Sequence, residues 1–291
     1  MGRGSYTASD WARLKESRKI DHSSVNEIFR AEKMDDKFNP LYIDKREARD
    51  SEEHPNSTPI IIGVDVTGSM GYLSEEIIKN SLDKLMKKLY STNLVEDPQL
   101  MFAAIGDAVE DEAPLQVTQF ESDIRIAEQL MDLWIEGAGG DSPEDYQLLW
   151  YFASRHTEID SFTKRSKKGF CFTIGDADFH QGLWAKDIKR IFGDDAKDIG
   201  TKKLAEEAGE KYELFHIDLK NSFDNAAHYI PGHVISIKPS EIKYLPEVIV
   251  GAIQKTNGID MKEILGPLDF SAKSVVEKAV CRLSSGKKIS L

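Results

Sequence analysis

From residue 58 to residue 257, short apolar runs alternate with longer segments whose apolar residues recur at helical spacing. The run at 60–64 is apolar and, apart from Gly63, β-branched, which is typical of a central strand buried on both faces. The segment that follows places Leu73, Ile77 and Leu82 on one face of a helix. This alternation predicts an α/β fold in which a mostly parallel sheet is covered by helices on both faces.

The same pattern predicts the remaining elements. Two strands at 100–105 and 115–120, joined by the acidic turn at 109–112, should form a hairpin that sets one antiparallel strand at the sheet edge. Further strands are expected at 170–174, 213–217 and 234–237, and helices at 123–135, 143–156, 184–192, 199–210 and 240–255.

The two ends of the chain differ from this central part. Residues 1–57 are polar and mixed in charge, hold two short helical patterns that begin after Ser9 and Ser23, and end in a polar run rich in turn-forming residues. We interpret them as a polar helical arm packed on the main domain, with a partner-binding or assembly segment as the alternative. The domain itself is predicted to span 58–257. Residues 258–291 form a tail with one expected helix.

Composition and charge argue against several classes of function. With 291 residues and 40% hydrophobic content, the chain can bury one substantial core. Its formal net charge of -12 argues against a general nucleic-acid binder, because such a surface repels phosphates. No stretch is apolar enough to span a bilayer or to act as a signal peptide. Two cysteines, one of them Cys171 inside an apolar run, are too few for a disulfide framework, so we expect a cytoplasmic protein. From the charge and the hydropathy we expect neither nucleic-acid nor membrane partners.

Acidic and hydroxyl residues gather where strands are expected to end. The first strand runs into DVTGSM, which begins at Asp65, a later cluster GGDSPE contains Asp141, and the fourth strand ends in GDAD, which contains Asp176. Ligands of open α/β sheets bind outside the carboxyl ends of the strands. Carboxylates gathered there repel one another unless a cation neutralises them, and the hydroxyls of Thr67 and Ser69 would add the hard oxygen ligands that Mg²⁺ or Mn²⁺ prefers.

These motifs resemble those of the von Willebrand factor type A (vWA) family. Asp65, Thr67 and Ser69 match the D-x-[S/T]-x-S signature of its metal-ion-dependent adhesion site (MIDAS). The segment GAGGDSPEDY resembles the G-G-G-D-x-P/A-E-D segment of one branch, which includes vWA domains attached to atypical alpha-kinases, and TIGDADFHQG is similar to the T-D-A-P-P-H-G of that branch. The resemblance covers about residues 59–255 and implies a three-layer, Rossmann-like vWA fold.

The resemblance also implies a divalent-cation site, with Mg²⁺ expected first and Mn²⁺ or Ca²⁺ as alternatives. Asp141 stands where integrin-type domains have a threonine, and its other interpretation is the N-cap of a helix opened by Pro143. An additional carboxylate near the ion would tighten cation binding and weaken the attraction for an external acidic ligand. The expected ligands are Asp65, Thr67, Ser69, Asp141 and Asp176, with Asp107, Asp178 and His180 in outer contacts.

By this resemblance the chain is a metal-dependent protein-binding module rather than an enzyme. In integrin-type vWA domains an acidic residue of a partner protein fills an open position on the metal, and family members often act as adaptors for AAA+ ATPases or larger assemblies. A metal-dependent phosphoesterase is one alternative, because strand-end aspartates also hold Mg²⁺ for phosphoryl transfer, but that pattern needs a second Asp where this chain has Thr67. A structural subunit with a vestigial site is the other.

Overall fold

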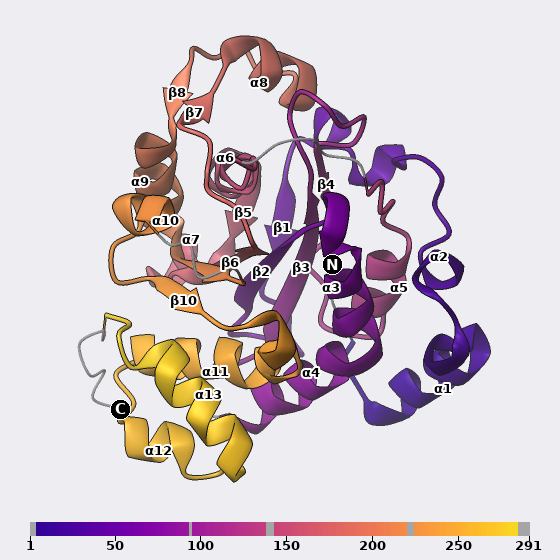
Figure 1. Cartoon of the computed structure of the whole chain (residues 1–291), viewed down its shortest axis with the longest axis vertical. Helices are drawn as coiled ribbons and strands as arrows, with labels where there is room; N and C mark the ends of the chain where they lie inside the picture. Colours follow the sequence, from indigo (N-terminus) through magenta and orange to yellow (C-terminus); the bar gives the residue numbers. More distant parts are fainter. Residues whose placement is uncertain (1–3, 93–94, 138–142, 220–223, 285–291) are drawn as a thin grey trace.

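The computed structural model describes residues 4–92, 95–137, 143–219 and 224–284 (Figure 1). Its centre is a 6-stranded sheet with strand order β10-β9-β6-β2-β3-β4. Neighbouring strands are parallel, except that β4 pairs antiparallel with β3 at the edge. The strands are β2 (Thr58–Asp65), β3 (Pro98–Ile105), β4 (Leu115–Val117), β6 (Gly169–Gly175), β9 (Tyr212–Asp218) and β10 (Val234–Ser236).

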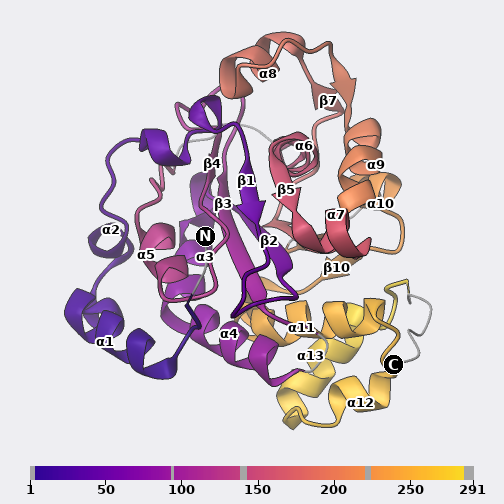
Figure 2. The same cartoon turned by 180° about the vertical axis from the view of Figure 1, so that it is seen from behind.

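Helices cover both faces of this sheet, as Figures 1 and 2 show from opposite sides. Side chains of β2 alternate between the faces, so that Ile60 and Ile62 join one buried apolar cluster and Ile61 joins the other. The first cluster is covered by α3 (Gly71–Glu76), α4 (Leu82–Ser91), α5 (Arg125–Met131) and α11 (Leu245–Thr256), and the second by α6 (Gln147–Arg155), α8 (Ala185–Phe192) and α9 (Thr201–Lys211). The predicted α/β fold with three layers and one antiparallel edge strand is thus confirmed.

Three predicted element boundaries are wrong. Pro143 does not open a helix, because the backbone of Glu144 bonds to the loop at 178–180, and α6 begins only at Gln147. The strand expected at 115–120 ends at Val117, where the Phe102 amide bonds to the Thr118 hydroxyl instead of to a backbone carbonyl. The helix expected at 240–255 is divided into a 3₁₀ helix (Pro239–Tyr244) and α11, since a proline in the first turn of α11 has no amide to continue the preceding helix.

The first part of the N-terminal arm lies along the α3 and α5 side of the domain (Figure 2), whereas Ile43 and Ala48 in its later part join the second apolar cluster on the other face. It contains α1 (Ala8–Arg18) and α2 (Val25–Ile28), and Trp11, Leu14 and Ile28 are buried in the first apolar cluster. A feature that the sequence pattern did not predict is β1 (Arg46–Ala48), which pairs parallel with β5 (Thr157–Ile159).

The C-terminal part forms two helices where one was predicted. These are α12 (Met261–Leu265) and α13 (Phe270–Val280), and both contact α11. The two cysteines lie in contrasting places: Cys171 is buried in β6, and Cys281 is exposed just after α13. The remaining elements are α7 (Asp160–Arg165), α10 (Asp224–Tyr229), β7 (Gly182–Leu183) and β8 (Ile199–Gly200).

Within the described residues, none of the helices combines the length and the apolar character needed to cross a membrane.

Candidate metal centre

Three neighbouring strands of the sheet end at carboxylates. β2 ends with Asp65, β3 is followed after one glycine by Asp107, and β6 is followed by Asp176. Because β2 pairs in parallel with both β3 and β6, with Asp65 opposite Ile105, these carboxylates follow the same edge of the sheet. This is the edge at which open α/β sheets bind ligands.

Asp65 has no exposed surface, and both of its carboxylate oxygens accept hydrogen bonds from within the chain. Oδ1 accepts from the Thr67 amide at 2.9 Å and from the Thr67 hydroxyl at 2.7 Å, which closes a tight turn directly after β2. Oδ2 accepts from the Tyr146 hydroxyl at 2.8 Å. Asp65 is therefore held rigidly, and it orients the hydroxyl of Thr67.

The Thr67 hydroxyl contacts a second buried acid, Glu144. Its Oγ1 lies 3.1 Å from Glu144 Oε1 in addition to its 2.7 Å contact with Asp65. A hydroxyl has one proton and can donate only one full hydrogen bond, so these two acids cannot both be ionised at that hydroxyl without a compensating charge. The other oxygen of Glu144, Oε2, is buried and has no hydrogen-bond partner within the part of the chain that the structure describes. A proton or a cation is therefore needed at this point to satisfy both acids.

Close packing at Gly175 holds the Tyr146 ring in place. A Cβ atom built on Gly175 would lie 2.0 Å from the Tyr146 hydroxyl oxygen, so only glycine leaves room for that hydroxyl at the end of β6. The same hydroxyl accepts from the Ala177 amide at 3.3 Å. Tyr146 thereby connects the ends of β2 and β6 with the start of α6.

Without a cation, the charges at this edge oppose one another. Burial raises the pKa of Asp65 to about 6, and the nearby Asp176 carboxylate contributes to the rise. Burial also raises the pKa of Glu144 to about 8, with further contributions from the charges of Asp65, Asp107 and Asp111. Hard oxygen donors with excess negative charge and an unpartnered buried oxygen fit a divalent cation such as Mg²⁺.

The other predicted site residues lie in different situations. Asp176 is half-buried beside Asp65, and Asp178 is exposed, with its backbone carbonyl accepting from the Glu144 amide. Ser69 lies in a 3₁₀ turn (Gly68–Met70), but its side chain lies outside the described part, and Asp141 falls wholly outside the described residues.

Asp107 and His180, predicted in outer contacts, lie together with a residue that was not predicted. Among the described residues, ligand-type atoms of Asp107, Asp145 and His180 all lie within 4.8 Å of one another, and neither Asp65 nor Asp176 belongs to this group. Sequence analysis missed Glu144, Asp145 and Tyr146 because an acidic pair after a proline is typical of a helix start. The signal that could have found them is the pair of acids directly before a run that is apolar except for Gln147.

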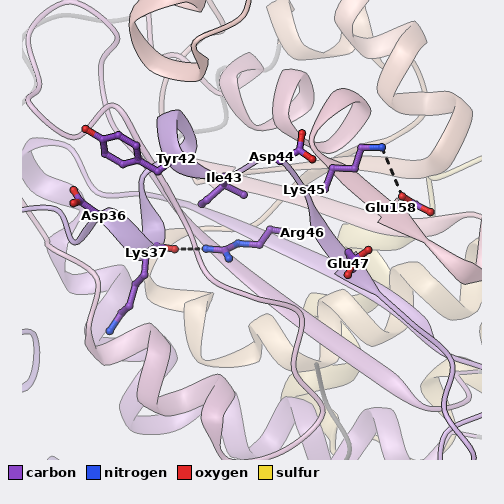
Figure 3. Close-up of a pocket in the computed structure, with 9 residues that line it drawn as sticks. All are labelled: Asp36, Lys37, Tyr42, Ile43, Asp44, Lys45, Arg46, Glu47 and Glu158. Carbon is purple, nitrogen blue, oxygen red and sulfur yellow. Dashed lines mark hydrogen bonds and ion pairs between the residues drawn. The ribbon is translucent and has the colours of Figure 1, made fainter.

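An open pocket of about 520 Å³ lies elsewhere, where β1 of the arm pairs with β5 (Figure 3). Lys45 pairs there with Glu158 at 3.6 Å, and Arg46 donates to the Lys37 carbonyl. Charges of both signs alternate around it, so the pocket favours neither anions nor cations. Its lining contains none of the predicted site residues and consists of Asp36, Lys37, Tyr42, Ile43, Asp44, Lys45, Arg46, Glu47 and Glu158.

No family model matches the sequence, and no curated protein matches it. Solved structures that resemble the chain include the pilus adhesin SpaC from Lactobacillus rhamnosus GG, with a TM-score of 0.46 and 9% identity over 69% of this chain and 31% of that chain. Proximal thread matrix protein 1 from the mussel byssus has a TM-score of 0.44 and 10% identity over 67% of this chain and 47% of that chain. A von Willebrand factor type A structure from Catenulispora acidiphila has a TM-score of 0.40 and 13% identity over 69% of this chain and 43% of that chain. The chain spans less than half the length of each of these structures.

Proposed function

We propose that this chain is a vWA-like module that holds a divalent cation, Mg²⁺ first, at the carboxyl edge of β2 and β6 and binds a protein partner over that edge. The observation that carries the proposal is the pair of buried acids, Asp65 and Glu144, at the single hydroxyl of Thr67. Among the described residues, no cationic side chain contacts either acid, so the compensating charge must come from a proton or a bound ion.

The residues around this pair suit a hard cation. Thr67 contributes a hydroxyl, Glu144 an unpartnered carboxylate oxygen and Asp176 a half-buried carboxylate, while the family resemblance adds Ser69 and Asp141. A bound dication would offset part of the negative charge of the local carboxylates and offer a coordination position to an acidic side chain of a partner. The role of Asp65 would be to supply negative charge and to hold the Thr67 hydroxyl toward the ion.

Exposed apolar side chains on the segments that border the site support a protein as the partner. Tyr72 follows the turn after β2. Partial burial raises the pKa of its hydroxyl, and the nearby charges of Asp176 and Asp65 raise it further. Val109 is 68% exposed in the loop whose amides bind Asp107. Trp184 is 55% exposed directly after β7, whose Gly182 carbonyl contacts Gln147. Exposed aromatic and aliphatic side chains beside a charged centre are typical of protein interfaces.

The many acids of this edge affect the kind of contact. Even with a dication bound, the carboxylates of Asp107, Glu144 and Asp145 weaken the attraction for an external acid, because like charges in a poorly hydrated site interact strongly. We infer that the partner relies on the bordering apolar side chains as much as on the ion. Asp65, with no exposed surface and both oxygens hydrogen-bonded, is poorly placed to attack a phosphate, which argues against the phosphoesterase alternative.

The test separates metal binding from partner binding. Calorimetric titration with Mg²⁺ and Mn²⁺ should give at least about tenfold weaker binding for Asp65→Asn, because loss of a supporting residue typically reduces metal affinity by that factor. Asp195→Asn removes an exposed carboxylate that pairs with Lys189 and belongs to none of the predicted site residues, so this matched control should bind like wild type. Equal affinities of wild type and Asp65→Asn would refute the site.

For the partner, the full chain is immobilised and used to capture proteins from the source cell with and without chelator. Trp184→Ala should reduce specific capture and leave Mg²⁺ affinity unchanged. Phe270→Ala, which removes an 88% exposed ring on α13, is the control and should change neither. Capture that is insensitive to chelator, to Asp65→Asn and to Trp184→Ala would contradict this function.

A further inference from the structure

A second group of metal-ligand side chains lies beside the centre described above. Asp107 comes from the loop after β3, Asp145 from the segment before α6, and His180 from the loop after β6. One ligand atom of each lies within 4.8 Å of the other two. Both aspartates are buried, with 6% and 4% of their surface exposed, and the histidine is half-buried.

The spacing of this group differs from that of an ion pair. Within the described chain, no hydrogen bond or ion pair joins His180 to either carboxylate, and neither ring nitrogen has a hydrogen-bond partner. Two ligands that share a zinc ion at about 2.1 Å each lie at most about 4.2 Å apart. The three ligand atoms therefore surround a gap that a metal ion would fill after small side-chain movements.

Local hydrogen bonds hold the two carboxylates in position. Oδ1 of Asp107 accepts from the amides of Val109 and Glu110, and in the described residues no donor contacts its Oδ2. Oδ2 of Asp145 accepts from the Ala108 amide at 2.7 Å. Both aspartates are thus bonded to amides of the loop at 108–110, and each carboxylate can still bind a metal ion.

A further buried acid, Glu144, adds negative charge beside this group. Glu144 is 8% exposed, its Oε2 has no hydrogen-bond partner among the described residues, and the charges of Asp65, Asp107 and Asp111 act on its carboxylate. Its backbone carbonyl accepts from the His180 amide at 3.2 Å, so this unpartnered acid is bonded to the segment that carries the histidine. Among the described residues, the guanidinium of Arg190 donates to the Ala108 carbonyl and to none of these acids.

We propose that Asp107, Asp145 and His180 bind a second metal ion, a transition metal of the Zn²⁺ class, at a site distinct from the magnesium site. An imidazole together with carboxylates suits Zn²⁺ better than Mg²⁺, which prefers oxygen ligands alone. Consecutive residues link the two sites, since Glu144 contacts Thr67 while Asp145 contacts the Ala108 amide. The proposed zinc site does not depend on whether the module binds a protein partner.

The proposal is tested by calorimetric titration of the full chain with Zn²⁺, after removal of bound metals. Wild type should bind a single Zn²⁺ tightly, and His180→Gln and Asp145→Asn should each weaken this binding more than about tenfold, since even supporting residues of metal sites contribute that much. His228→Gln removes an exposed histidine of α10 and is the matched control. It should leave Zn²⁺ binding unchanged.

The comparison with Asp65→Asn separates the two sites. This variant should keep its Zn²⁺ affinity while losing Mg²⁺ affinity, and His180→Gln should show the reverse. Unchanged Zn²⁺ binding in His180→Gln, or its loss in His228→Gln, would overturn the proposal, as would loss of Zn²⁺ binding in Asp65→Asn. Thermal melting in chelator shows whether Asp145→Asn is folded. If it is not, the Zn²⁺ titration of His180→Gln, on a half-buried residue, decides whether the proposal holds.

Discussion

The hydroxyl of Tyr146 donates a 2.8 Å hydrogen bond to Oδ2 of Asp65, and this contact joins the start of α6 to the end of β2. Tyr146 has no exposed surface, and its ring also packs against Phe179 in the loop after β6. The geometry of the candidate metal centre therefore depends on a residue of the apolar core. Substitutions that leave every candidate ligand intact should still change cation binding.

Tyr146→Phe tests this dependence. We expect the free energy of unfolding to fall by about 1 kcal/mol, because a buried acceptor loses its donor. Cation affinity should fall as well, since Asp65 is no longer fixed. Tyr151→Phe is the matched control, because Tyr151 lies on the same helix and donates at 2.7 Å to Asp194, away from the site. Urea unfolding and Mg²⁺ titration of both variants provide the check, and equal Mg²⁺ affinities would contradict a positioning role for Tyr146.

Gly175→Ala should disturb the same contact from the opposite side. The new Cβ would meet the Tyr146 hydroxyl at 2.0 Å, so the ring must move away from Asp65. We expect a loss of stability of about 1–3 kcal/mol, as for overpacked cores, together with weaker cation binding. Gly209→Ala in α9, where nothing lies within 4 Å, should instead stabilise the protein by up to about 1 kcal/mol. Thermal melting of the two variants should therefore shift in opposite directions.

The stability of the metal-free protein should increase as the pH is lowered from 8 to 6. The pKa of Glu144 is raised from 4.5 to about 8 by burial, and that of Asp65 from 3.8 to about 6. Over these intervals the folded state binds more protons than the unfolded state, so the free energy of unfolding falls as pH rises. The change should be on the order of 1–3 kcal/mol and should be smaller in Glu144→Gln.

Saturating Mg²⁺ should reduce this pH dependence, because the ion replaces the proton at Glu144. The measurement is urea unfolding at several pH values, in chelator and in Mg²⁺. A metal-free protein whose stability rises steadily from pH 6 to pH 8 would contradict a buried, uncompensated acid pair.

The central strands of the sheet could be predicted from the sequence because strands that are buried on both faces consist mainly of apolar residues. Residues 60–64 are apolar throughout and residues 170–174 are apolar except for Thr173, and both segments lie in central strands that are buried on both faces. By contrast, β1 and β5 are three-residue polar strands whose pairing depends on the arm's position over the domain, and periodicity contains no such information.

The candidate site was predictable only where a motif follows a strand directly. Asp65 and Thr67 form a local turn, which short-range spacing specifies. Glu144 reaches Thr67 because its backbone pairs with the loop after β6, a tertiary contact that overrides the helix-starting character of Pro143. Hydrophobic periodicity likewise identifies Tyr146 only as an aromatic core residue and does not indicate that its hydroxyl bonds to Asp65.

The two cysteines differ in how accessible they are to solvent, so their rates of chemical modification can be compared within one molecule. Cys171 lies in β6 with no exposed surface, and burial raises the pKa of its thiol, whereas Cys281 is exposed beyond α13. A thiol reagent in solution reaches Cys281 at once but reaches Cys171 only when β6 separates from its neighbours. The delay between the two modifications therefore measures how often the central sheet opens. It does so without any added label, on the strand that leads directly to Asp176.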